Sequence, residues 1–125
     1  MFTLGLQRRF VAQHRMVGGD WGPENDLHSH AYLLEITLEG ATLDKHGFLV
    51  DLDDLDRQLE GLIGQYRDQT LNDLPAFGGL NPSLENFARI LCRSLAAGTR
   101  ATGLSAVNVR LWENESAWAA FREAR

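Results

Sequence analysis

Hydrophobic and polar positions alternate with a period of two along most of the N-terminal half of the chain. From Phe2 to His14 the apolar residues fall two apart, which predicts a strand. Residues 15–27 contain the run VGGDWGPEND, which is dense in turn formers and predicts a loop. A second strand is predicted over His30–Leu38. After turn signals at residues 39–47, a short third strand is predicted over Phe48–Leu52.

The period lengthens to three and four residues from Asp53 onward, which is typical of amphipathic helices. The apolar stripe of the first predicted helix comprises Leu52, Leu55, Leu59, Leu62, Ile63 and Tyr66. Aspartates at its start suit the positive end of a helix dipole. A second helix is predicted with Asn81 as its N-cap, Pro82 in the first helical position and an end near Gly98.

The C-terminal segment returns to strand-like alternation. LSAVNVRLW, residues 104–112, predicts a strand, and the tail over residues 115–125 is predicted to form a short final helix. Successive strands joined by short turns pair antiparallel, and two amphipathic helices need one face of the sheet to bury their stripes. The pattern therefore predicts a single α+β domain over residues 1–125, with a four-stranded antiparallel sheet and two helices on one face.

Composition and charge narrow the classes of function. The chain has 125 residues, 44% of them hydrophobic and 23% charged, with a formal net charge of -5. A basic face for nucleic acid or an anionic membrane is therefore not expected, and no apolar run approaches the roughly 20 residues of a membrane helix. The N-terminus does not resemble a secretory signal. A single cysteine, Cys92, excludes an internal disulfide and fits a cytoplasmic protein.

Three of the four histidines are expected to converge. Side chains two apart on a strand point the same way, so His28 and His30 face one point. In an antiparallel hairpin the end of the first strand neighbours the start of the second, which brings His14 alongside. Three neutral imidazoles with an open fourth position form a common catalytic zinc arrangement, which we favour over solvated histidines that flank a loop. His46 lies in a turn signal and is expected at the surface.

Six motifs that recur in order give the chain a family resemblance. They are FVAQHR (10–15), LHSHAY (27–32), GFLVDLDDL (47–55), LND (71–73), NPSLENFA (81–88) and VRLWEN (109–114). Together they resemble the 6-pyruvoyltetrahydropterin synthase family, which includes 6-carboxytetrahydropterin synthase of queuosine biosynthesis. The resemblance covers nearly the whole chain, with Ser29 where the family usually has glycine.

The resemblance implies a fold, a cofactor and a substrate. The fold would be a tunnelling fold (T-fold), in which trimeric barrels stack into a homohexamer with active sites between subunits. Zn²⁺ would bind His14, His28 and His30, and the substrate would be 7,8-dihydroneopterin triphosphate or a close relative. Glu113 fits the family's pterin anchor, because a carboxylate can accept two neighbouring N–H groups.

Two further groups of residues are candidate contacts of the ligand. Ser83 and Glu85 sit in the segment where the family has a Pro-Thr-x-Glu-like motif, so the resemblance makes them candidates for ligand contact, although a helix-capping role explains them equally well. Arg8, Arg9 and Arg15 are candidates for binding phosphate, but strand alternation points Arg8 and Arg9 to opposite faces.

Two proton-transfer groups of the family are replaced here. Glu24 stands where the family usually has a catalytic cysteine, and Cys92 is expected to be a packed thiol instead. Asp68 matches the family's aspartate, but Gln69 replaces its histidine partner and cannot shuttle a proton. Glu24 has three open interpretations, namely a base or acid, a fourth metal ligand, or a bystander. One branch of the family resembles this chain in having glutamate there and cleaves the side chain to 6-hydroxymethyl-7,8-dihydropterin, a folate precursor.

Three functions are consistent with these residues. The favoured one is a zinc-dependent, pterin-forming lyase with Glu24 and Asp68 as catalytic groups. The alternative is a non-catalytic protein that binds zinc and a pterin, which needs only the histidines and Glu113. A scaffold without ligand is the third, but it offers no reason for three converging histidines.

Overall fold

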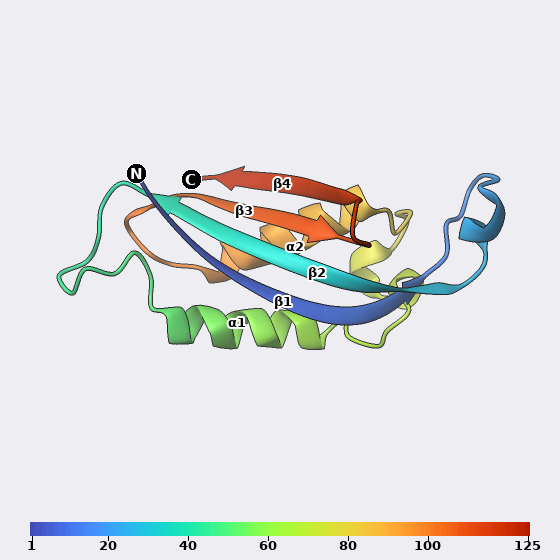
Figure 1. Cartoon of the computed structure of the whole chain (residues 1–125), viewed down its shortest axis with the longest axis horizontal. Helices are drawn as coiled ribbons and strands as arrows, with labels where there is room; N and C mark the ends of the chain where they lie inside the picture. The colour runs from blue at the N-terminus through green and yellow to red at the C-terminus, as the bar shows by residue number, and fades with distance from the viewer.

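A long hairpin forms one side of the sheet and carries the predicted histidines. The structure is a computed structural model that describes residues 1–125. Strand β1 (Phe2–His14) pairs antiparallel with β2 (His28–Gly40) along its whole length, from Phe2 opposite Gly40 to His14 opposite His28. Figure 1 shows the connecting loop extending beyond the rest of the sheet, with the short 3₁₀ helix η1 (Gly22–Asn25) in it.

Two further strands complete the sheet in the order β1-β2-β3-β4. β3 (Leu104–Trp112) pairs antiparallel with β2, and β4 (Trp118–Ala124) pairs antiparallel with β3. Helices α1 (Leu52–Gly64) and α2 (Leu84–Gly98) lie on the same side of this sheet, and the two chain termini lie close together at one end (Figure 1). The predicted antiparallel sheet with two helices on one face is confirmed.

Capping residues define where the helices begin. The Asp51 side chain accepts hydrogen bonds from the backbone N–H groups of Asp53 and Asp54, as expected of an aspartate at an N-cap. The Ser83 side chain accepts a hydrogen bond from the N–H of Asn86 and caps α2. Between the helices lie two single 3₁₀ turns, η2 (Leu71–Asp73) and η3 (Pro75–Phe77).

The core lies between the sheet and the helices and ends in an aromatic cluster beneath the histidines. Tyr32 is 1% exposed, and its ring stacks on Phe10 with centroids 5.4 Å apart and meets Phe87 edge-on at 5.2 Å. His30 precedes Tyr32 by two residues and therefore lies on the same face of β2. This rigid aromatic layer supports one side of the histidine cluster.

Two elements predicted from the sequence are wrong. Residues 48–52 form no strand, because Asp51 caps α1 and the preceding segment crosses to the helix layer, where Leu49 is buried in the core. Residues 115–125 are not helical, because residues 118–124 form β4 along the edge of β3, with Trp118 opposite Trp112. Pairing on an exposed sheet edge overrides the helix propensity of the alanines, glutamates and arginines in the tail. The sheet thus has four strands, but its fourth member is the tail.

The predicted N-cap of the second helix is also wrong by two residues. Ser83 caps α2, and Asn81 uses its side-chain oxygen to accept a hydrogen bond from the N–H of Val17 instead. None of the helices has the length and apolar character needed to cross a membrane.

Candidate metal centre

Three imidazoles meet at the end of the β1–β2 hairpin where the connecting loop leaves the sheet. His14 is the last residue of β1, and His28 and His30 begin β2. Because His14 lies opposite His28 in the register, all three side chains fall on the face that packs toward the helices. The ring centroids form a nearly equilateral triangle, with His14–His28 at 4.6 Å, His14–His30 at 4.8 Å and His28–His30 at 4.9 Å. The predicted convergence of the three histidines is confirmed.

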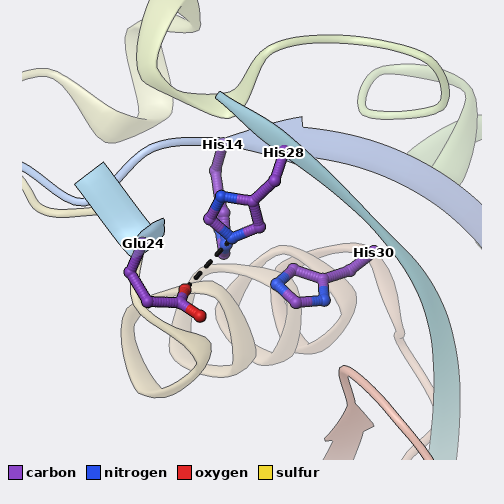
Figure 2. A group of neighbouring side chains, drawn as sticks. All are labelled: His14, Glu24, His28 and His30. Carbon is purple, nitrogen blue, oxygen red and sulfur yellow. Dashed lines mark hydrogen bonds and ion pairs between the residues drawn. The ribbon is translucent and has the colours of Figure 1, made fainter. Parts of the chain in front are cut away.

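Glu24 adds a carboxylate to this cluster. One ligand atom from each of His14, His28, His30 and Glu24 lies within 4.8 Å of the others. Figure 2 shows the Glu24 side chain reaching from η1 toward the rings, with its Oε2 3.1 Å from His28 Nε2. The Glu24 side chain is 55% exposed, so it borders the cluster on the solvent side.

The surroundings of His14 keep its ring neutral and oriented. The side chain is 1% exposed, and burial, with further contributions from His30 and His28, lowers the pKa of His14 to about 4. The Tyr32 hydroxyl lies 3.3 Å from Nδ1 of the ring. A neutral imidazole with one nitrogen occupied presents the lone pair of the other nitrogen to the cluster.

His28 is oriented in the same way. Its Nδ1 lies 2.7 Å from the backbone carbonyl oxygen of Asp26, so Nδ1 is the protonated nitrogen and Nε2 faces the cluster. His14 Nε2 and His28 Nε2 are 3.0 Å apart. Two nitrogen ligands of a tetrahedral zinc lie roughly 3.3 Å apart, given Zn–N distances of about 2.0–2.1 Å. The pair therefore suits a shared cation.

His30 supplies an independent indication that a ligand belongs here. Its Nε2 is buried and has no hydrogen-bond partner. The nearest carboxylate oxygen, Glu113 Oε2, is 3.9 Å away, beyond hydrogen-bonding distance. A buried nitrogen without a partner is costly in a folded protein, and coordination of a metal removes that cost. The donor set and the unpaired nitrogen both fit a divalent metal such as zinc.

The other predicted site residues lie at different distances from the cluster. Glu113 directly follows β3 and borders His30, with a side chain that is 26% exposed. Ser83 is committed to capping α2, and Glu85 is exposed in the first turn of that helix.

The two positions of the predicted proton-transfer pair, Asp68 and Gln69, are exposed. The N–H of Asp68 donates to the carbonyl of Val11, three residues before His14.

The structure leaves fewer of the three arginines as candidates for binding phosphate. Arg8 forms an ion pair with Asp56 of α1, on the helix side of the sheet. Arg9 is exposed on the opposite face from the histidines, and Arg15 is exposed immediately after His14. Cys92 is a buried thiol within α2, as predicted, and His46 is exposed in its turn.

Sequence reasoning missed a set of asparagines around the loop that carries Glu24. Asn72 and Asn81 bind the backbone of residues 15–17, and Asn25 binds the backbone of residues 16, 19 and 21. Asn72 and Asn81 stand in the LND and NPSLENFA motifs, which was the available signal, but motif recurrence alone assigned them no role.

Comparison with known proteins relates this site to one family. The sequence model described as 6-pyruvoyl tetrahydropterin synthase matches residues 3–124. A protein of Archaeoglobus fulgidus, described provisionally as a 6-carboxy-5,6,7,8-tetrahydropterin synthase, is 25% identical over 119 residues, which span 95% of this chain and 94% of that protein.

Solved structures extend the likeness to the fold. The 6-pyruvoyl tetrahydropterin synthase of Caenorhabditis elegans superposes with a TM-score of 0.85 at 20% identity, covering 98% of this chain and 96% of that chain. The enzyme of the same description from Plasmodium vivax superposes with a TM-score of 0.79 at 14% identity, covering 100% of both chains. These neighbours confirm the predicted tunnelling fold.

Proposed function

Because the chain belongs to the 6-pyruvoyl tetrahydropterin synthase family, we propose that it is a zinc-dependent, pterin-forming lyase that acts on 7,8-dihydroneopterin triphosphate or a close relative. The observation that carries the proposal is the convergence of three oriented imidazoles and the Glu24 carboxylate, with His30 Nε2 buried and unpaired. His14, His28 and His30 would hold the zinc. When bound, zinc would supply Lewis-acid polarisation of the substrate's side-chain oxygens.

Glu24 is the proposed proton-transfer group. Its carboxylate borders the cluster on the solvent side, where a substrate would enter, and no cysteine lies nearby because Cys92 is buried within α2. Two solved structures of the P. vivax enzyme are described as catalytic residue mutants in which a glutamate is replaced by alanine or cysteine. A glutamate therefore serves as a catalytic residue in one protein of this fold, which supports the same role for Glu24.

The reaction that we favour within the family cleaves a carbon–carbon bond of the side chain. Glu24 would take the proton of the second side-chain hydroxyl, the bond between the first two side-chain carbons would break, and the oxygen would become a carbonyl. The first carbon would then receive a proton, which gives 6-hydroxymethyl-7,8-dihydropterin. We keep Asp68 as a second candidate for proton transfer, because it is an exposed carboxylate hydrogen-bonded through its N–H to β1 near His14.

Glu113 is the proposed anchor of the pterin ring. Its N–H donates to the carbonyl of Ala117, so the backbone is fixed while the carboxylate makes no hydrogen bond of its own. A carboxylate in this state can accept two N–H groups from a pterin beside the metal centre. Contact of Ser83 or Glu85 with substrate stays a prediction, since the Ser83 oxygen already caps α2.

We also propose a homohexamer of two stacked trimers with active sites between subunits. The first half of β1 and the whole of β4 present unpaired sheet edges, which another copy of the chain can extend. Size-exclusion chromatography with light scattering tests this, and a mass of six 14.0 kDa chains is expected.

A second candidate function is a non-catalytic protein that binds zinc and a pterin. It is favoured by the position of Glu24, which has a carboxylate oxygen within 4.8 Å of a ring nitrogen of each of the three histidines and would fill the fourth metal position. Gln69, at the position where the family usually has a histidine, also favours this function because glutamine cannot shuttle a proton.

Product analysis separates the two functions. Zinc-loaded protein is incubated with 7,8-dihydroneopterin triphosphate, and the products are identified by mass spectrometry. A 6-substituted pterin would support the lyase, and its side chain would identify the reaction. Glu24→Gln should lower kcat by about 10²- to 10⁴-fold, the usual contribution of a general base, with zinc content unchanged. Unaltered substrate in the presence of folded, zinc-loaded wild-type protein would favour the binding function.

A further inference from the structure

Side-chain amides, rather than regular secondary structure, hold the chain that follows His14. Arg15 makes two hydrogen bonds with Asn72: the Arg15 N–H donates to Oδ1, and Nδ2 donates to the Arg15 carbonyl, both at 2.9 Å. The N–H of Val17 donates to Asn81 Oδ1 at 3.1 Å. Asn72 belongs to η2 and Asn81 lies just ahead of α2, so two separate elements fix this segment from outside.

Met16, between the two anchored residues, links them to Glu24. Its N–H donates to the backbone carbonyl of Glu24 at 2.8 Å, and its own carbonyl accepts a hydrogen bond from Asn25 Nδ2 at 3.0 Å. These two contacts join the start of the loop to η1, the turn that carries Glu24. The side chains of Asn72 and Asn81 make their hydrogen bonds to the backbone of Arg15 and Val17 and none to the histidine rings or the Glu24 carboxylate, which makes the backbone of residues 15–17 their direct route to Glu24.

Apart from hydrogen bonds within the loop, chiefly those of Asn25, the loop has little else to keep it in place. The residues of η1 include none that is buried, and its first residue, Gly22, has a positive φ of 62°. Without apolar packing, a loop of this kind keeps its geometry through hydrogen bonds to fixed neighbours. A displacement of the order of 1 Å in a catalytic group can cost roughly 10²-fold in rate.

We infer that Asn72 and Asn81 are positioning residues that hold the Glu24 carboxylate at the metal centre by anchoring the backbone on either side of Met16. The inference rests on the proposed role of Glu24 in proton transfer. It assigns a task to two motif asparagines whose side chains hydrogen-bond the backbone of Arg15 and Val17. The LND and NPSLENFA motifs, although far from the loop in sequence, thus contact its first residues in the folded chain.

The two asparagines differ in the chemistry that they require, which gives a sharp test. Asn81 acts only as an acceptor toward Val17, so Asn81→Asp should retain the contact, whereas Asn81→Ala loses it. Asn72 is both acceptor and donor toward Arg15. Asn72→Asp should therefore also lower kcat, because its carboxylate keeps the acceptor for the Arg15 N–H but cannot donate to the Arg15 carbonyl and repels it.

Steady-state kinetics form the first part of the experiment. We expect Asn72→Ala, Asn72→Asp and Asn81→Ala to lower kcat by about 10- to 100-fold with KM nearly unchanged, and Asn81→Asp to restore kcat. Zinc content should stay at the wild-type value, since the ligands lie on β1 and β2. Asn108→Ala is the matched control, because Asn108 is a half-buried asparagine that hydrogen-bonds Thr37 and Glu39 on the far face of the sheet. In the Glu24→Ala background, Asn81→Ala should lower kcat no further.

Hydrogen exchange at the Met16 amide is the second part and needs no turnover. Neither asparagine touches this N–H, which binds only the Glu24 carbonyl. We expect the Asn72→Ala/Asn81→Ala double variant to exchange it at least about tenfold faster than wild type, with Asn108→Ala unchanged. Unchanged Met16 exchange, or a loss of kcat that persists in full without the Glu24 side chain, would overturn the inference. If wild type lacks turnover, the proposed function fails, and the exchange result alone decides whether the asparagines hold the Glu24 segment.

Discussion

Replacement of His30 by leucine should change stability in opposite directions with and without metal. In the metal-free protein, His30 Nε2 is buried without a partner, which costs about 1–3 kcal/mol for a fully buried group. The His30 side chain is 18% exposed, so we take the lower end of that range. His30→Leu removes the unpaired nitrogen and keeps an apolar side chain beside Tyr32. The metal-free variant should therefore unfold with a free energy about 1 kcal/mol higher than wild type.

Zinc should reverse this order. At a free zinc concentration 100 times its Kd, binding to the native state alone adds about 2.7 kcal/mol to the free energy of unfolding of the wild type. The variant keeps only His14, His28 and Glu24 as ligands and should gain much less. A residue that costs stability in the free protein and confers it on the loaded protein is retained for binding, not for folding.

The assay is urea denaturation monitored by circular dichroism at neutral pH, first with EDTA and then with zinc. His46→Leu is the control, because His46 lies exposed in a turn and its replacement should change the free energy of unfolding by less than about 0.5 kcal/mol under both conditions. The reasoning is refuted if metal-free His30→Leu is less stable than wild type by more than about 1 kcal/mol. An undiminished gain from zinc in the variant would show that His30 is no ligand.

Three further predictions concern the neighbouring residues. Glu113→Gln keeps the size of the side chain but loses the charge and one acceptor, so KM for the pterin should rise about tenfold or more with zinc content unchanged; an unaltered KM in steady-state assays would remove Glu113 from the pterin site. Ser83→Ala should lower the free energy of unfolding by about 1 kcal/mol through loss of the α2 cap, and a KM equal to wild type would identify Ser83 as a cap alone. Burial raises the pKa of the Cys92 thiol to about 11 from 9.0, so the native state holds that proton more tightly than the unfolded state. The resulting stability is complete below about pH 9 and is lost as the pH rises toward 11. Urea unfolding should then show a steeper loss over this range for wild type than for Cys92→Ala, and equal slopes would contradict the shift.

The histidine cluster was predictable from local pattern because its geometry follows from a strand period and a hairpin. Alternation places His28 and His30 on one face, and antiparallel pairing places His14 opposite His28. Both helices were predictable for the same reason, since their apolar stripes repeat at helical spacing over three or more turns.

The tail and the segment at residues 48–52 were not predictable from local pattern. Residues 115–125 consist largely of good helix formers, yet the free edge of β3 pairs with residues 118–124 and outweighs a propensity of a few tenths of a kcal/mol per residue. Residues 48–52 alternate like a strand, but Asp51 caps α1 and these residues pair with no strand of the sheet. In both places the decisive term is the presence or absence of a partner strand.

The sequence by itself determined the α+β class, both helices, the long hairpin and the convergence of three histidines, because each depends on the period of side chains along one or two adjacent segments. Only the tertiary structure decided that Glu24 reaches the cluster and that Asn72 and Asn81 hold its loop. The two asparagine contacts join residues 57 and 64 positions apart, and nothing in the local sequence around a polar side chain identifies a distant hydrogen-bond partner. Periodicity records which face of an element is buried, whereas hydrogen-bond partners are set by how the elements pack.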